Sequence, residues 1–405
     1  MSLADQASLL LIPSGYKSQK VYSIFPTDGD GDFDFSRSGS ATRIAKNGLI
    51  TTVDSNIPRL EYPMIDGVQK GCPSLILEPQ RTNVCGYSDD FTQWSLTNGT
   101  LSSNSVISPD GTLNADKVVF NNIALDLKRT VTVTASTTYT FSFYIKLESG
   151  NGLQGRFYDN SNSSNIVYYD YSKQVIGTDW TRVTRQVTTP SGCTQMQVWL
   201  LAASTSLVTA SFWGAQLEVG SYETSYIPTP SASIVTRQAE TCTGAGDATT
   251  FSDSEGVLMA EIEGTEDGTN KFITISDGSI QNRITIIFLS NNIVAQVRAS
   301  NSEVFFQSTS GISIENYNKI AVYYKTNQCK LFVNGMQVGL TDTLATMPSG
   351  LDTLTFDNGN GVDDFYGNTK QIQYYNSALT DSELEQLTSW TSFTDMAQAQ
   401  QYSIK

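Results

Sequence analysis

The sequence predicts an all-β protein of more than one domain. Its 405 residues exceed the roughly 100–200 residues of an ordinary domain. Short runs rich in Val, Thr, Tyr and Phe recur along the chain, and Gly, Asn, Ser or Pro separates them. Repeated short runs with turn residues between them are typical of β-sandwiches and jelly rolls, so we expect few and short helices.

The first 84 residues form a segment with many Gly, Pro, Asp and Ser residues, in which Lys20–Phe25 and Ser74–Leu77 are predicted strands. Residues 85–229 alternate more regularly and predict a first β-sandwich. Its strands are expected at Ala115–Phe120, Thr137–Leu147, Ile166–Tyr171, Thr181–Thr188, Gln195–Ala202 and Thr209–Trp213. The two prolines of Tyr226–Pro230 indicate a linker, which we place at residues 230–245.

Residues 246–405 predict a second β-sandwich. Its strands are expected at Val257–Ile262, Lys271–Ser276, Arg283–Leu289, Ile293–Ala299, Glu303–Gln307, Asn318–Tyr324, Gln328–Val333, Thr353–Phe356 and Lys370–Tyr375. Asn334-Gly335 predicts a tight hairpin turn. The capping box Thr380–Glu383 predicts a short surface helix, and a second helix is expected over Asp395–Tyr402.

The net charge of −15 is unevenly distributed. Residues 1–239 hold 17 basic and 20 acidic residues, whereas residues 240–405 hold 8 basic and 20 acidic residues. The acidic balance argues against nucleic acid as a partner, because phosphate is bound through Lys and Arg. No stretch reaches the roughly 18 apolar residues of a membrane span, so membrane insertion is not expected.

The chain contains no histidine, which excludes catalysis by Ser-His-Asp or Cys-His groups and a His-ligated zinc site. The five cysteines are widely spaced and form no CxxC pair, so free thiols are expected. The amino terminus has no basic region before its apolar run and predicts no secretory signal.

Three blocks of sequence resemble known families. Gly31–Ile44, Gly48–Ile50, Pro58–Tyr62 and Cys72–Asn83 resemble the N-terminal module of bacteriophage tail, fibre and head-surface proteins. Phe212–Thr229 is similar to the closing strand of the carbohydrate-binding-module-like jelly roll that follows this module. Phe332–Val338 and Asp363–Leu387 are similar to the end of laminin-G/concanavalin A-like lectin domains.

The resemblance implies a virion surface protein, with an attachment module at residues 1–84, a carbohydrate-binding-module-like sandwich at 85–229 and a lectin-like sandwich at 246–405. Its implied partners are other virion proteins, further copies of itself in a trimer and host cell-surface polysaccharide. The attachment-module residues implied by the matching blocks are Phe33, Arg37, Arg43, Arg59 and Arg81.

Exposed aromatic rings are candidates for glycan binding, because sugars stack their apolar face on flat rings while polar neighbours bind the hydroxyls. The selected candidates are Tyr158, Tyr168, Trp180 and Trp199. Trp94 and Tyr169 are further candidates, and a place in the core is the alternative for each ring. Trp213 lies in a buried-looking strand and is expected in the core.

Two acidic loops raise the question of calcium, which prefers oxygen ligands. Asp28–Asp34 lacks the bidentate Glu of a calcium loop and is expected to be a solvated turn. Asp357, Asp363 and Asp364 lie in a Gly- and Asn-rich loop and are candidate Ca²⁺ ligands. Solvated carboxylates in Asx-turns are the alternative there.

We expect no enzymatic activity. A glycosidase needs two carboxylates placed across a cleft, and the sequence around Asp159, Asp170, Glu261 and Glu263 marks none of them as catalytic. The expected function is a fibre-like or decorating protein of the tail or head that binds host glycans. A purely architectural role and a polysaccharide depolymerase are the alternatives.

Overall fold

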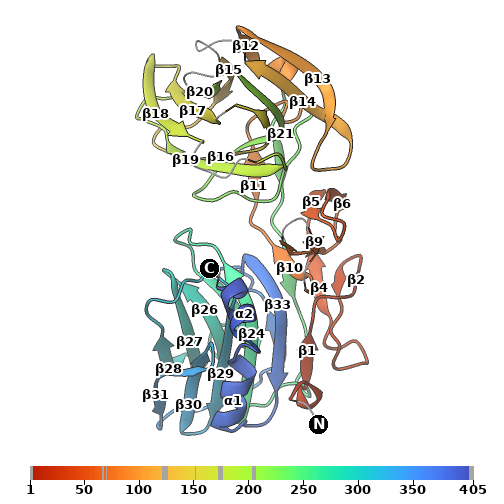
Figure 1. Ribbon diagram of the computed structural model, residues 1–405. Helices are drawn as coiled ribbons and strands as arrows, with labels where there is room; N and C mark the ends of the chain where they lie inside the picture. Colours follow the sequence, from red (N-terminus) through yellow and green to blue (C-terminus); the bar gives the residue numbers. More distant parts are fainter. Residues whose placement is uncertain are drawn as a thin grey trace. The chain divides into compact units, whose positions relative to one another are not determined.

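The computed structural model describes residues 3–65, 68–69, 71–120, 126–150, 152–171, 177–202 and 207–400. The predicted all-β fold is confirmed, since these residues form mainly antiparallel sheets (Figure 1). The chain divides into two compact units. The middle unit comprises residues 40–52 and 80–238, and the C-terminal unit comprises residues 1–39, 53–79 and 239–405. The division of the chain into four segments stays a prediction. In the structure, the first 84 residues contribute to both units.

The middle unit is built on two five-stranded sheets. One has the strand order β12 (Ser95–Thr97), β15 (Asp126–Thr132), β20 (Gln195–Ala202), β17 (Leu153–Asp159) and β18 (Ser164–Asp170). The other has the order β13 (Gly99–Ile107), β14 (Leu113–Phe120), β21 (Val208–Val219), β16 (Thr138–Ser149) and β19 (Thr181–Thr188). Two short pairs, β5 (Ala41–Ile44) with β6 (Ile50–Val53) and β11 (Arg81–Asn83) with β22 (Val235–Arg237), and the turn η2 (Phe91–Gln93) complete the described elements.

Aromatic side chains fill the space between these two sheets. Phe141 from β16 meets Phe157 from β17 edge to face, with ring centres 6.1 Å apart. Phe143 lies on the same side of β16 and contacts Phe212 of β21. On the opposite face of β21, Trp213 is 2% exposed and packs on Tyr226 at 4.5 Å in a separate small cluster, which confirms its predicted place in a core. Each buried ring removes a large apolar area from water, so this core stabilises the sandwich.

The C-terminal unit also contains two large sheets. The first has the order β31 (Met336–Asp342), β30 (Gln328–Val333), β29 (Asn318–Lys325), β24 (Glu255–Gly264), β33 (Gly367–Tyr375), β10 (Ser74–Leu77) and β7 (Arg59–Glu61), and β1 (Leu9–Leu11) also pairs with β33. The second has the order β28 (Ser302–Ser308), β27 (Asn292–Ala299), β26 (Arg283–Leu289), β25 (Lys271–Ser276) and β32 (Thr353–Thr355). Smaller elements are β2 (Tyr16–Lys17), β3 (Lys20–Val21), β4 (Phe33–Ser36) and β23 (Thr241–Thr243) in one sheet, β8 (Met64–Ile65) with β9 (Val68–Gln69), and the turn η1 (Ala4–Gln6).

Two local predictions in this unit are confirmed. Asn334 and Gly335 both have positive φ angles and join β30 to β31 as a hairpin. Thr380 caps helix α1 (Asp381–Thr388) through the predicted capping box with Glu383. Helix α2 (Phe393–Ala399) begins two residues before the predicted Asp395–Tyr402, whose last two residues lie outside the described residues.

Helix α1 covers the outer face of the larger sheet (Figure 1). Leu384 and Leu387 face the sheet and pack in one cluster with Val257, Met259 and Phe332. The inner face of the same sheet carries Leu258 and Ala260 into the main core. None of the helices in the described part of the chain has the length and apolar character of a membrane span.

A buried ion cluster ties the N-terminal strands to the start of the C-terminal sandwich. Arg37 Nη1 lies 2.7 Å from Glu240 Oε1, and both side chains are fully buried. Arg59 also contacts Glu240 and lies 2.8 Å from Glu78 Oε2. Buried charges are stable when they are paired and hydrogen-bonded, so these side chains depend on one another.

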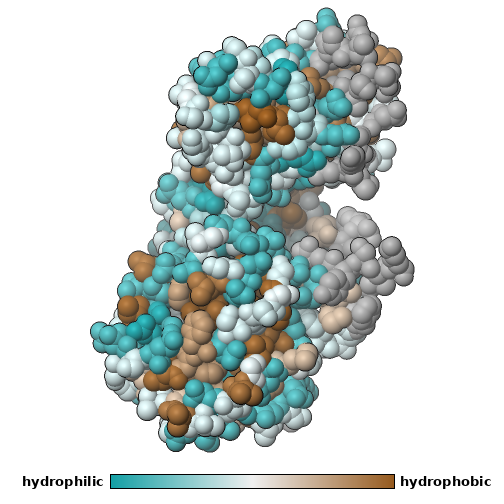
Figure 2. Space-filling model, turned by 90° about the vertical axis from the view of Figure 1, so that its left-hand side faces the viewer, coloured by the Kyte–Doolittle hydropathy of each residue, from teal (hydrophilic) through white to brown (hydrophobic). Residues whose placement is uncertain are grey.

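The edge strands of the C-terminal unit expose several apolar side chains. They are Phe306 of β28, Met336 and Leu340 of β31, and Leu344 just beyond it. Figure 2 looks onto the side of this unit that carries β31, where apolar and polar side chains are mixed.

Candidate functional site

The candidate site is the outer face of strands β15, β20, β17 and β18 in the middle unit. Side chains along a strand alternate between the two faces of its sheet. In β17, Leu153 and Phe157 point into the core, whereas Arg156 and Tyr158 lie on the other face. A side chain at Gly155 would clash with the ring of Tyr171, so the inward side of this strand is closely packed. The alternation therefore leaves polar and aromatic residues for the outer face.

The strand register aligns the outward residues in three rows across the four strands. The first row is Asp126, Leu201, Gln154 and Asp170; the middle row is Lys128, Trp199, Arg156 and Tyr168; the third row is Thr130, Gln197, Tyr158 and Asn165. Directly paired residues of an antiparallel sheet lie on one face about 5 Å apart. The middle row therefore places two cations and two aromatic rings side by side.

The indole of Trp199 is bracketed by the two cations of the middle row. The guanidinium carbon of Arg156 lies 3.4 Å from the ring centre, and Nζ of Lys128 lies 4.2 Å from it. Such cation–π contacts hold both cations in place. Arg156 Nη1 also donates a hydrogen bond of 3.3 Å to the hydroxyl of Tyr168, which is 56% exposed. Tyr168 is thus the more accessible ring, and Trp199 positions the cations.

Amide side chains form a hydrogen-bonded network along the third row. Trp199 Nε1 donates to Gln197 Oε1 at 2.9 Å, which orients the indole. Gln197 Nε2 in turn donates to Asn160 Oδ1 at 3.1 Å and to Thr130 Oγ1 at 3.3 Å. The ring of Tyr158 lies 6.2 Å from that of Trp199. The network holds amide groups beside the aromatic rings.

Asp159 builds the turn that carries Asn160. Its carboxylate accepts hydrogen bonds from the backbone of Ser161 and Asn162 at 3.0 Å each, and from Asn162 Nδ2 at 2.7 Å. Burial raises the pKa of Asp159, but hydrogen bonds from Asn162, Cys193 and Ser161 outweigh this effect and leave the pKa below its ordinary value. Asp159 therefore stays ionised and holds the turn that places Asn160 beside Gln197.

Three of the predicted glycan-binding residues, Tyr158, Tyr168 and Trp199, come together on this face. Trp180 does not join them, because its Nε1 donates to the carbonyl of Ile107 and its ring packs with Trp213 on the other sheet. Trp94 and Tyr169 belong to the core and its edge. The prediction did not include Lys128, Arg156 or Gln197. Their outward phase was readable from the alternation along each strand, but their cross-strand partners were not.

The three candidate calcium ligands have local hydrogen-bond partners in the structure, and their role as Ca²⁺ ligands stays a prediction. Among the described residues, no group of three or more acidic, His or Cys side chains is placed to hold a metal ion. Asp357 accepts hydrogen bonds from Thr355 Oγ1 and the backbone N–H of Gly359. Asp363 accepts from Asn358 Nδ2, and Asp364 from the Tyr366 hydroxyl. These are the local turn contacts of the alternative interpretation.

The residues assigned to attachment lie largely inside the protein. Phe33 is fully buried against Phe356, with ring centres 5.3 Å apart. Arg37 and Arg59 belong to the buried ion cluster. In the middle unit, Arg43 lies in β5 and Arg81 lies 4.0 Å from Glu218. Their contacts give Phe33, Arg37 and Arg59 a role in the fold, and a role of the five residues in attachment stays a prediction.

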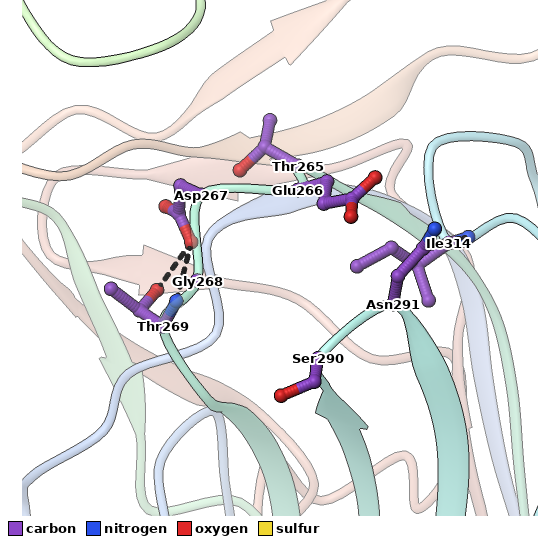
Figure 3. A pocket seen from close by; sticks show the side chains of 8 residues that line it. All are labelled: Thr265, Glu266, Asp267, Gly268, Thr269, Ser290, Asn291 and Ile314. Atoms are coloured by element: carbon purple, nitrogen blue, oxygen red, sulfur yellow. Dashed lines mark hydrogen bonds between the residues drawn. The ribbon is translucent and has the colours of Figure 1, made fainter. Parts of the chain in front are cut away.

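A small hollow in the C-terminal unit is a second candidate (Figure 3). It has a volume of about 190 Å³ and is lined by Thr265, Glu266, Asp267, Gly268, Thr269, Ser290, Asn291 and Ile314. Asp267 accepts hydrogen bonds from Thr269, drawn in Figure 3, and from Lys271 Nζ at 2.6 Å. Its carboxylate thus shapes its own loop. The lining contains no aromatic ring, so the outer face is the stronger candidate.

Several solved structures are similar in part. One is a sialidase carbohydrate-binding module (CBM40) of Ruminococcus gnavus bound to α2,3-sialyllactose. It shares 18% identity with this chain at a TM-score of 0.32, and the alignment covers 35% of this chain and 86% of that chain. Domain 4 of an arabinanase of Geobacillus stearothermophilus shares 12%, with a TM-score of 0.31 and coverages of 37% and 73%. Tailspike protein 4 of bacteriophage CBA120 shares 12%, with a TM-score of 0.27 and coverages of 34% and 21%.

No curated protein matches the chain. Residues 89–205 match the family model CBM_4_9, described as a carbohydrate binding domain. This range contains β15, β17, β18 and β20, and with them all three rows of the outer face. The outer face therefore lies within the part of the middle unit that is similar to this carbohydrate binding domain family.

Proposed function

We propose that the protein binds glycan on the outer face of β15, β20, β17 and β18. The observation that carries the proposal is the clustering of Tyr158, Tyr168 and Trp199 with amide and cationic side chains, inside the range that matches a carbohydrate binding domain. A flat ring with a few convergent polar groups is the usual composition of a sugar site.

The middle row and the amide network of the third row have distinct parts in binding. A sugar ring stacks on Tyr168, whose side chain is the most exposed of the three aromatic residues. Gln197 and Asn160 present amide groups to the sugar hydroxyls, and their mutual hydrogen bond keeps these groups oriented. Preorganised polar groups lose little entropy when the ligand binds. A single open binding face gives modest affinity for a glycan. Several copies of the protein would be needed for firm attachment to a glycan-covered surface.

A glycan array with the full chain tests the proposal. We expect binding to at least one class of glycan, and we expect Tyr168→Ala to weaken it by about tenfold, equivalent to about 1.4 kcal/mol. Tyr222→Ala is the matched control, since Tyr222 belongs to the same unit and lies beside Arg81. Folded protein that binds no glycan would refute the proposal, as would equal losses in both variants.

We also propose that binding is not followed by cleavage. The outer face brings Asp126 and Asp170 to the two ends of its first row, three strand spacings apart, with Leu201 and Gln154 between them. Lys128 Nζ lies 3.3 Å from Asp126 and pairs with it, so this carboxylate already has a partner within the face. Release of reducing ends from a bound polysaccharide would contradict this proposal and support a depolymerase.

We further propose that the protein is a surface component of a phage particle. The support is the ordered series of blocks between Gly31 and Asn83, which resembles the N-terminal module of phage tail, fibre and head-surface proteins. In that role the protein would contact other virion proteins and form homo-oligomers, with a trimer expected. Cryo-electron microscopy of particles tests the location, and sedimentation of the purified protein tests the trimer. Burial of the outer face between subunits would favour a purely architectural role.

A further inference from the structure

We infer that the glycan bound at the outer face is acidic, with a sugar carboxylate held by Arg156. This inference rests on the proposed glycan binding and specifies its ligand class. Arg156 makes no ion pair with any carboxylate in the described part of the chain. Its Nε is buried without a hydrogen-bond partner among the same residues, and only Nη1 of its terminal nitrogens has a hydrogen bond there, so Nη2 is the nitrogen left for a ligand. The guanidinium is therefore held in place while much of its donor capacity is unused.

The contacts of Arg156 favour a planar anionic ligand. Trp199 lies against the guanidinium at 3.4 Å and the Tyr168 hydroxyl accepts from Nη1. A guanidinium presents its donors in a fork that matches a carboxylate, and such charge-assisted bonds are stronger than bonds to neutral hydroxyls. Because the aromatic contacts already restrict the side chain, little rotamer entropy remains to be lost on binding.

Charge along the rows sets the orientation of the ligand. Lys128 lies on the other side of Trp199 and is balanced by Asp126 at 3.3 Å. Asp126 and Asp170 both lie in the first row, so they repel an anion from that edge. A carboxylate at Arg156 therefore directs the rest of the glycan toward the third row, where Gln197 and the amides lie.

The charge of the unit as a whole permits an anionic ligand. The middle unit holds 12 basic and 11 acidic residues, a net charge of +1, whereas the C-terminal unit holds 13 and 29, a net charge of −16. The acidic character of the chain thus lies outside the unit that carries the outer face. Long-range repulsion is also screened within about 10 Å at moderate salt.

Matched pairs of polysaccharides test the inference. Binding of the full chain is measured by affinity electrophoresis and calorimetry with polygalacturonate, alginate, hyaluronan and polysialic acid, each beside its carboxyl-reduced form, in about 0.15 M salt. We expect at least one acidic form to bind tenfold or more tightly than its reduced partner. Arg156→Gln should abolish this preference and Arg156→Lys should restore part of it. Arg298→Gln, the same change in charge in the other unit, should leave it intact.

The outcomes separate this inference from the proposed function. Equal binding of acidic and reduced forms, or binding of neutral glycans alone, overturns the acidic ligand and leaves glycan binding standing. Equal binding of dextran sulfate would show general affinity for polyanions and would also overturn the inference. Failure of folded protein to bind any glycan, acidic or neutral, overturns both.

Discussion

The guanidinium of Arg156 lies 3.4 Å from the centre of the Trp199 ring, and the two residues are direct cross-strand partners in β17 and β20. The contact explains why Trp199 is an indirect element of the candidate site: its ring holds a cation instead of offering a bare face to a sugar. Substitution of a tryptophan that positions a cation should affect ligand affinity differently from substitution of a tryptophan that stacks on the ligand.

Replacement of Trp199 by Ala should weaken glycan binding by about tenfold, because Arg156 and Lys128 lose the surface that holds them. Trp199→Phe should retain part of the affinity, since a smaller ring still supports a cation. Trp180→Ala is the control, as this ring packs on the other sheet. It should lower the thermal stability of the middle unit and leave the affinity unchanged. Calorimetric titration measures the affinity and thermal unfolding measures the stability. A similar loss of affinity in Trp199→Ala and Trp180→Ala would contradict the role of Trp199 in positioning the cations.

Glu240→Gln should destabilise the C-terminal unit by about 3–5 kcal/mol, because it leaves Arg37 and Arg59 buried with one carboxylate fewer. Asp34→Asn removes an exposed ion pair with Lys20 and should cost less than about 1 kcal/mol. Denaturant unfolding, followed separately for each unit, measures both changes. Equal costs for the two substitutions would show that the buried cluster is dispensable.

The C-terminal unit should lose stability as the pH rises from about 4.5 to 7. Burial raises the pKa of Glu263 from 4.5 to about 7, although Asn368 donates it a hydrogen bond of 2.8 Å. In this window the folded protein keeps a proton that the unfolded chain has released, so stability falls with pH and is constant above the window. The effect is at most about 3 kcal/mol. Urea midpoints at pH 5 and pH 8 measure it, and Glu263→Gln should flatten the difference. An unchanged pH dependence in that variant would assign the effect to other groups.

Removal of the carboxylate of Asp159 should weaken glycan binding, although Asp159 itself is not expected to contact the ligand. Asp159→Ala breaks the turn at Ser161 and Asn162, so Asn160 is no longer held beside Gln197. We expect a loss of about threefold to tenfold in affinity, together with about 1–3 kcal/mol of stability for the buried hydrogen bonds. Asp110→Ala, a carboxylate with similar turn contacts to Thr112, should affect stability alone. Calorimetry and denaturant unfolding of both variants give the comparison.

The features that could be predicted from the sequence are those set by local chemistry. The Asn334-Gly335 turn and the Thr380 capping box follow from backbone preferences within four residues, and both are confirmed. The shared face of Tyr158 and Arg156 follows from the two-residue period of a strand. Local patterns thus predicted several of the strands, β18 and β20 among them, whereas β15 and β17 were not among the predicted strands.

Long-range pairing could not be predicted in this way. Leu9 pairs with Tyr374, and Arg37 binds Glu240 from 203 residues away. Nothing in either local sequence specifies its partner, because many strands share the same pattern and the choice depends on the packing of the whole unit. For the same reason the sequence does not distinguish Trp199 from Trp180, although Trp199 lies in β20 and Trp180 precedes β19 and packs against the other sheet.

Hydrogen exchange can locate glycan bound to the outer face of the middle unit. Exchange is measured on the full chain with and without the glycan that binds most tightly in the array. We expect slower exchange in peptides covering β15, β17, β18 and β20, and unchanged exchange in the loop at 265–269 of the C-terminal unit. Slower exchange confined to that loop, or no change in the four strands under saturating glycan, would contradict glycan binding at the outer face.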